Sequence, residues 1–120
     1  MKTHGLTHIS LAVRDPEKSM RFYADVFGFT EYYRDETSIQ ANRKDGWEIL
    51  AFERDARNAG KAGGVRHFGF RLVRPEDIDE AVQSVLRAGG KLKDRGEFSP
   101  GFPYAYVFDP DGYEIEIWFE

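Results

Sequence analysis

The chain has 120 residues, of which 41% are hydrophobic and 15% aromatic, and its net charge is −4. This length allows one compact domain with a substantial core, and the composition argues against disorder. Acidic and basic residues are mixed along the chain without a basic stripe, which argues against a nucleic-acid partner. The chain has no cysteine. Disulfides, thiolate metal sites and cysteine nucleophiles are therefore excluded, and any metal must bind histidine, carboxylate or carbonyl groups.

The N-terminal residues contain no apolar run long enough for a signal peptide. No later stretch approaches the length of a membrane span. We therefore expect a soluble, cytoplasmic protein without a membrane partner.

The first half of the chain begins with a strand-like pattern from His8 and continues into a helix predicted over residues 16–27. Asp15 is a favourable N-cap, Pro16 suits the first helical position, and Gly28 can end the helix in a left-handed conformation. One face of this helix carries an apolar stripe, formed by Met20, Tyr23, Ala24 and Phe27. Three predicted strands follow, at residues 29–34, 38–41 and 47–52.

The second half follows a polar, glycine-rich stretch at residues 53–64, which predicts a linker. A new strand-like pattern begins at His67, and a second helix is predicted over residues 75–88 with Gly89 as its stop signal. Arg74 is a weak cap for this helix. Its apolar stripe consists of Ile78, Ala81, Val82, Val85 and Leu86. Three more strands are predicted at residues 91–94, 105–108 and 113–119.

The two halves resemble each other. When His8 is placed over His67, the segments HISLAVRDPEKSMRF and HFGFRLVRPEDIDEA both reach Pro-Glu at the same offset and then enter a helix. Each half has the order β-α-β-β-β, which predicts an α+β fold of two tandem βαβββ modules, at about residues 5–54 and 65–119. About 50 residues make too small a core to stand alone, so we expect a single domain over residues 1–120.

Three polar residues share one predicted face. The last strand alternates strictly after the turn DPDG, with Glu116 opposite its apolar side chains. His8 and His67 likewise lie opposite the apolar faces of their strands. Because each apolar face should pack under a helix, the three polar residues are expected on the helix-free side.

Two imidazoles and one carboxylate are suitable ligands for a divalent first-row metal with open coordination positions. Each residue alone is more often an ordinary surface residue, but the recurrence in a duplicated unit favours a metal site at His8, His67 and Glu116. Glu48 is a candidate fourth ligand, and Glu53 competes with it if the register differs by one residue.

The chain resembles the vicinal oxygen chelate superfamily, which includes glyoxalase I, extradiol dioxygenases, fosfomycin-resistance enzymes and bleomycin-resistance proteins. The segments THISLAVRDPEKSMRFYADVFGF, RHFGFRLVRPEDIDEAVQSVLRAGG and YVFDPDGYEIEIW carry this resemblance. It implies two βαβββ modules forming a cup-shaped half-barrel sheet with the helices on the convex face. It also implies metal ligation by His8, His67 and Glu116, and a homodimer in which a site can be shared between subunits.

The resemblance also implies the chemistry. A small-molecule substrate chelates one divalent metal ion (zinc, nickel, cobalt, manganese or iron) through two adjacent oxygens, and the metal acts as a Lewis acid. A nearby carboxylate moves the proton, and Glu48 is the best match for it. Tyr106 corresponds to a tyrosine found before the DPxG turn in extradiol dioxygenases, and Arg71 is in phase with His67. We expect both to contact substrate.

The branches of the superfamily differ in their further requirements. The segment before Tyr106 has no histidine, which argues against ordinary extradiol cleavage. The sequence ends four residues after Glu116, which argues against the fosfomycin-resistance branch, where a basic residue beyond the last ligand holds the substrate. Both histidines and Glu116 are present, which favours an enzyme over a metal-free bleomycin-resistance-type binder.

These expectations lead to one main hypothesis and several alternatives. The main hypothesis is a metal-dependent, glyoxalase-like lyase or isomerase. The alternatives are an iron-dependent dioxygenase variant, a small-molecule binding protein without turnover, and a structural relic whose polar face carries only water.

Overall fold

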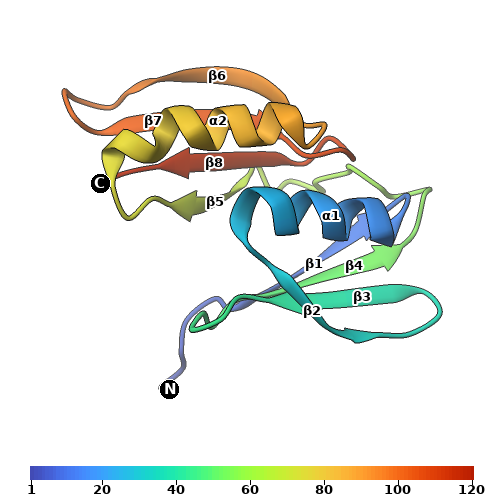
Figure 1. Ribbon diagram of the computed structural model, residues 1–120. Coiled ribbons are helices and arrows are strands. Elements are labelled where there is room, and N and C mark those ends of the chain that lie inside the picture. The colour runs from blue at the N-terminus through green and yellow to red at the C-terminus, as the bar shows by residue number, and fades with distance from the viewer. The chain divides into compact units, whose positions relative to one another are not determined.

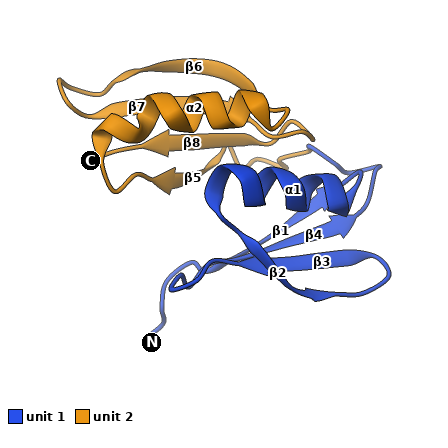
Figure 2. Cartoon of the chain, viewed as in Figure 1, with its two compact units in different colours: residues 1–60 blue, residues 61–120 orange.

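The computed structural model describes all 120 residues, which divide into two compact units, residues 1–60 and 61–120 (Figure 2). Each unit contains one four-stranded mixed sheet and one α-helix that packs on a face of it (Figure 1). The α+β class and the repeated βαβββ order are therefore confirmed. No helix combines the length and the apolar character needed to cross a membrane.

Unit 1 has the strand order β1-β4-β3-β2, in which β1 and β4 are parallel and the other pairs are antiparallel. Its elements are β1 (His8–Val13), α1 (Pro16–Phe27), β2 (Thr30–Arg34), β3 (Ser38–Asn42) and β4 (Ile49–Arg54). Strand β4 runs two residues beyond its predicted end at residue 52, so the linker between the two units begins later than expected.

Unit 2 repeats this topology with the order β5-β8-β7-β6, in which β5 and β8 are parallel. Its elements are β5 (Phe68–Arg71), the 3-10 helix η1 (Pro75–Asp77), α2 (Ile78–Arg87), β6 (Lys91–Glu97), β7 (Pro103–Phe108) and β8 (Glu114–Trp118). Strands β6 and β7 are longer than predicted, because the whole of their length pairs in the sheet.

The helix ends follow the capping signals of the sequence. Asp15 Oδ1 accepts a hydrogen bond of 3.0 Å from the Glu17 amide, and Gly28 adopts φ 73°, so α1 has the predicted bounds. The second helix starts with three residues of 3-10 helix because Arg74 offers no side-chain cap. The predicted helix over residues 75–88 is thus correct in position, although its first turn is 3-10 helix and its last helical residue is Arg87.

The core of each unit lies between helix and sheet. In unit 1, Tyr23 of α1 stacks on Phe52 of β4 with ring centroids 5.1 Å apart, and both side chains are fully buried. In unit 2, Val85 of α2 is buried together with Val107 and Ile115 of the sheet. Alternate residues of the strands therefore project from the opposite, helix-free face.

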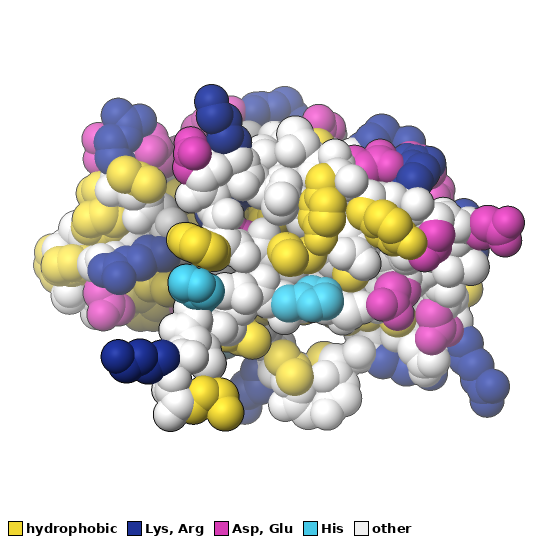
Figure 3. Space-filling model, turned by 90° about the horizontal axis from the view of Figure 1, so that it is seen from below, with side chains coloured by type: hydrophobic (Ala, Val, Ile, Leu, Met, Phe, Trp, Pro, Cys, Tyr) yellow, Lys and Arg dark blue, Asp and Glu magenta, His cyan; other side chains and the backbone are white.

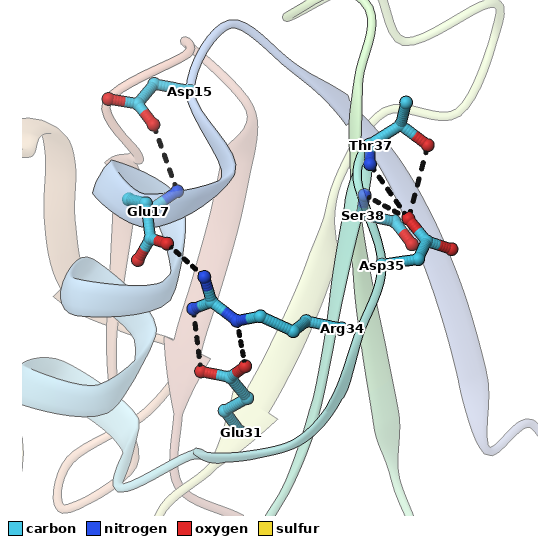
Figure 4. A network of polar contacts seen from close by, with 7 residues as sticks. All are labelled: Asp15, Glu17, Glu31, Arg34, Asp35, Thr37 and Ser38. Atoms are coloured by element: carbon cyan, nitrogen blue, oxygen red, sulfur yellow. Dashed lines mark hydrogen bonds and ion pairs between the residues drawn. The ribbon is translucent and has the colours of Figure 1, made fainter.

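An ion-pair network joins β2 to α1 on the helix side of unit 1 (Figure 4). Arg34 Nη1 lies 2.5 Å from Glu17 Oε1, and the same guanidinium pairs with Glu31. These bonds raise the pKa of Arg34 and lower that of Glu31. The groups are exposed, so the network orients β2 more than it stabilises the fold.

Candidate metal centre

The helix-free face of unit 2 brings together two of the three predicted metal ligands. His67 immediately precedes β5, and Glu116 lies in the middle of β8, which pairs with β5. His67 Nε2 is 3.2 Å from Glu116 Oε2. One third of the His67 side chain and 17% of that of Glu116 remain exposed, so neither side chain is fully buried.

The second oxygen of Glu116 is held by Tyr106. The Tyr106 hydroxyl, from the neighbouring strand β7, donates a hydrogen bond of 2.9 Å to Glu116 Oε1. The Tyr106 ring also packs edge-on against the His67 ring, with centroids 5.3 Å apart. The three side chains form one connected group in which Tyr106 fixes the orientation of the carboxylate.

The hydrogen bond to Glu116, followed by burial, raises the pKa of Tyr106 above its ordinary value. In metal-free protein, we expect Glu116→Gln to lower the pKa of Tyr106. The hydrogen bond stabilises the fold below the ordinary tyrosine pKa of about 10, and this contribution is lost as pH rises through the raised pKa. NMR titration of protein with ring-labelled tyrosine measures the pKa of Tyr106, and the Tyr106→Phe variant identifies which signal belongs to this residue. An unchanged pKa in Glu116→Gln would contradict the expectation.

Gly69 makes room for a tryptophan beside the His67–Glu116 pair. A Cβ at position 69 would lie 2.6 Å from Cζ3 of Trp118 and 2.9 Å from the carbonyl oxygen of Glu116. The indole of Trp118 therefore lies over the backbone of β5, next to Glu116 on the same face. The sequence analysis did not single out Gly69. The sequence did contain a signal for this contact, because a glycine inside a strand pattern often marks a position where another group approaches the backbone closely.

Gly69→Ala is expected to destabilise the protein by about 1–2 kcal/mol, because the new methyl group meets both backbone and ring. Urea unfolding measures this change. Gly46→Ala is the matched control, since the closest contact of its Cβ is the flexible end of the Glu48 side chain. Gly69→Ala/Trp118→Leu should recover part of the loss. Equal effects of Gly69→Ala and Gly46→Ala would show that the crowding at position 69 is unimportant.

The third predicted ligand, His8, lies in unit 1. It is the exposed first residue of β1 and pairs with Ile49 of β4. No group of three or more histidine, aspartate or glutamate side chains converges anywhere in the structure. The structure thus brings together His67 and Glu116 within one unit, and the participation of His8 stays a prediction.

The shared register of the two units identifies the position in unit 1 that corresponds to Glu116. Ser10 pairs with Ala51 in unit 1, and Gly69 pairs with Glu116 in unit 2. Ser10 and Gly69 each lie two residues after the aligned histidine. Ala51 therefore occupies the place of Glu116, and it has no group that can bind a metal.

Glu48 has a different environment from the one expected. It precedes β4 by one residue, and its carboxylate pairs with the Arg43 guanidinium. Glu48 was expected on the polar face of the strand. Its position is instead in phase with Leu50 and Phe52, which lie on the face that is buried under the helix. Pairing of Ile49 with His8 sets this phase. The catalytic role of Glu48 stays a prediction.

Glu53, the alternative to Glu48, does lie on the helix-free face. It pairs with Ala12 of β1 and Ser38 of β3, and its side chain is exposed. Ala12 is four residues along β1 from His8, which places Glu53 about 13 Å along the strand from the histidine. That separation is too long for both side chains to bind one ion directly.

Arg71 follows His67 on the same face of β5, as predicted. Its guanidinium donates a hydrogen bond to the backbone carbonyl of Glu120, so one of its donors is already in use. The remaining donors can still contact an anionic group, which is what the sequence analysis expected of Arg71.

Comparison with known proteins agrees with this fold. The sequence matches the Glyoxalase/Bleomycin resistance protein/Dioxygenase superfamily over residues 5–117, and the chain belongs to that superfamily. It is 30% identical over 115 residues to the glutathione transferase FosA of Serratia marcescens, covering 94% of this chain and 79% of that protein. A probable lactoylglutathione lyase of Vibrio cholerae is 29% identical, with 98% and 91% covered.

Solved structures share the fold at lower sequence identity. The fosfomycin resistance protein FosX of Listeria monocytogenes has a TM-score of 0.82 at 20% identity, covering 99% of this chain and 95% of its own. A lactoylglutathione lyase of Agrobacterium tumefaciens has a TM-score of 0.74 at 16% identity, covering 99% and 96%. The sequence analysis argued against the fosfomycin-resistance branch, yet a structure from that branch shares the fold as fully as the lyase does.

Proposed function

We propose that this protein is a metal-dependent enzyme of the vicinal oxygen chelate type. Its reaction would be a glyoxalase-like lyase or isomerase step on a small molecule that chelates the metal through adjacent oxygens. The observation that carries the proposal is the 3.2 Å approach of His67 Nε2 to Glu116 Oε2 on a helix-free sheet face. Two donor atoms at this separation can bind one ion together.

The proposed ligands are His67, Glu116 and His8, for a single zinc, nickel, cobalt, manganese or iron ion. The alanine at position 51 supports a set of three protein ligands, since unit 1 has no carboxylate at the position equivalent to Glu116. Three ligands leave coordination positions for two substrate oxygens. When bound, the ion would supply Lewis-acid stabilisation of negative charge on those oxygens.

The surrounding residues have separate proposed roles. Tyr106 holds Glu116 Oε1, which leaves Oε2 directed toward His67. Tyr106 and Arg71 would line the substrate site, with Arg71 contacting an anionic group of the substrate. Glu48 would move a proton only after its carboxylate separates from Arg43, with which it is paired. A homodimer would allow the ligands to come from two chains.

A second candidate function is metal-dependent thiol transfer to a small molecule. It is favoured by the similarity to the glutathione transferase FosA and to the metallothiol transferase FosB of Lysinibacillus sphaericus, 26% identical over 121 residues. A manganese-dependent 2,3-dihydroxybiphenyl 1,2-dioxygenase of Geobacillus is 28% identical, but this chain spans 36% of its length. Dioxygenase activity therefore remains the third alternative.

The test combines metal loading with three assays. Untagged protein is stripped with chelator and loaded separately with each of the five metals, and bound metal is counted by mass spectrometry. Each form is then given methylglyoxal with glutathione, fosfomycin with glutathione or cysteine, and catechol under oxygen. Thioester formation supports the lyase, loss of free thiol only with fosfomycin supports thiol transfer, and oxygen uptake supports the dioxygenase. Failure to bind any of the metals would overturn the enzyme proposal.

A further inference from the structure

Unit 1 carries an open groove of about 880 Å³ on the helix-free face of its sheet, toward the turn that joins β2 to β3. Its lining residues come from β2, β3, β4 and the segments that follow β2 and β4. They are Tyr32, Tyr33, Asp35, Thr37, Ser38, Gln40, Glu53, Arg54 and Asp55. None of them belongs to the proposed metal ligands.

Two consecutive tyrosines line one side of this groove. Neighbours in a regular strand point to opposite faces, but the pairing of β2 with β3 shifts between Glu31 and Tyr33. This bulge lets both rings face the groove, and they stay 49% and 48% exposed. The Tyr32 hydroxyl donates to Gln40 Oε1 at 2.8 Å and the Tyr33 hydroxyl to Asp35 Oδ2 at 3.4 Å. Both hydroxyl groups are therefore held by hydrogen bonds while about half of each residue stays exposed.

The charge of the groove is negative, with the three carboxylates of Asp35, Glu53 and Asp55 against the single guanidinium of Arg54. Asp35 is fixed by the Thr37 and Ser38 amides, each 2.8 Å from its Oδ1 (Figure 4). These backbone bonds lower the pKa of Asp35, so it is charged at neutral pH. No hydrogen bond or ion pair engages the Glu53 carboxylate, and Glu53 lies opposite Ser38 in the pairing of β3 with β4.

A groove with fixed aromatic faces and carboxylates favours one class of ligand. The face of a tyrosine ring attracts a cation, and hydrogen bonding of Tyr33 to a carboxylate makes its ring more electron-rich. An anionic ligand would be repelled by the carboxylates. A neutral aromatic ligand would leave the free Glu53 carboxylate without a partner.

We propose that this groove binds a small organic ammonium ion, with the cation over the Tyr32 and Tyr33 rings and close to the Glu53 carboxylate. The proposal does not depend on the metal centre, because none of the lining residues is a proposed ligand. Side chains of both charge signs occur on the face that Figure 3 shows, so the surface is not uniformly acidic. The expected preference for cations therefore rests on the carboxylates that line the groove.

The test uses choline and its uncharged isostere, 3,3-dimethylbutan-1-ol, as probes. NMR titration of ring-labelled tyrosine should show choline shifting the Tyr32 and Tyr33 signals with millimolar affinity. The isostere should bind at least about fivefold more weakly, because it lacks the charge that attracts the rings and Glu53. Glu53→Gln should weaken choline binding about threefold, and Tyr32→Leu/Tyr33→Leu about tenfold, as measured by calorimetry.

Glu36→Gln is the matched control, because it removes one exposed carboxylate of the same unit that does not line the groove. It should leave the affinity for choline unchanged. Three outcomes would each overturn the proposal. They are equal binding of choline and the isostere, equal effects of Glu53→Gln and Glu36→Gln, and no shift of the tyrosine NMR signals at about 50 mM choline, well above the expected Kd of about 1 mM. Metal content should be unchanged in Glu53→Gln, which separates this result from a failure of the proposed function.

Discussion

Glu116→Ala is expected to lower metal affinity at least about 100-fold and to abolish turnover. Loss of a residue that only orients a ligand already costs about 10–100-fold in affinity, and Glu116 is proposed as a ligand itself. His67→Ala should have the same effect, because the two donor atoms lie 3.2 Å apart and would bind one ion together. Titration with each metal against a competing chelator measures the affinity, and circular dichroism verifies that the variants fold.

Glu114→Ala is the control for this prediction. Glu114 lies on the same face of β8, two residues before Glu116, and pairs with Lys93. Its removal takes away the same charge from the same strand without removing a proposed donor, so the metal affinity should change less than about threefold. Tyr106→Phe should lower the metal affinity about 10-fold, which is more than Glu114→Ala and less than Glu116→Ala, because Tyr106 orients Glu116 without binding the metal. If all four variants bind metal equally, the site lies elsewhere.

Asp109→Ala is expected to reduce the free energy of unfolding by about 3 kcal/mol, because three backbone amides, including the buried amide of Tyr113, would lose the Oδ1 acceptor. Asp109 is 4% exposed, and its Oδ1 accepts from the amides of Asp111, Gly112 and Tyr113 at 2.9–3.0 Å. These bonds form the turn from which β8 starts. Denaturant unfolding measures the loss.

Asp109→Asn is the matched variant for this turn. Its amide oxygen can still accept the same three amides, and asparagine is as common as aspartate in such turns. We expect a loss smaller than about 1 kcal/mol. The metal affinity of Asp109→Ala should fall as well, since a displaced β8 moves Glu116 relative to His67. Equal stability of the two variants would show that the amide contacts contribute little.

Local signals determined much of the fold. Asp15, Pro16 and Gly28 set both ends of α1, because capping depends on bonds within a few residues of the helix end. The matching Pro-Glu landmarks after His8 and His67 predicted the repeated βαβββ order, since each helix must cover its own sheet. The weaker start of α2 followed from the absence of a cap at Arg74.

The sequence by itself also determined which side chains share a face in β8, where strict alternation put Glu116 opposite the buried residues. Only the tertiary structure decided how strands that are distant in sequence align, because register depends on pairing across the sheet. Pairing of Ile49 with His8 put Glu48 in the buried phase and Ala51 at the place of Glu116. Pairing of Gly69 with Glu116 likewise fixed the place of Trp118. The sequence thus named the donor residues, and the strand pairing decided which of them can meet.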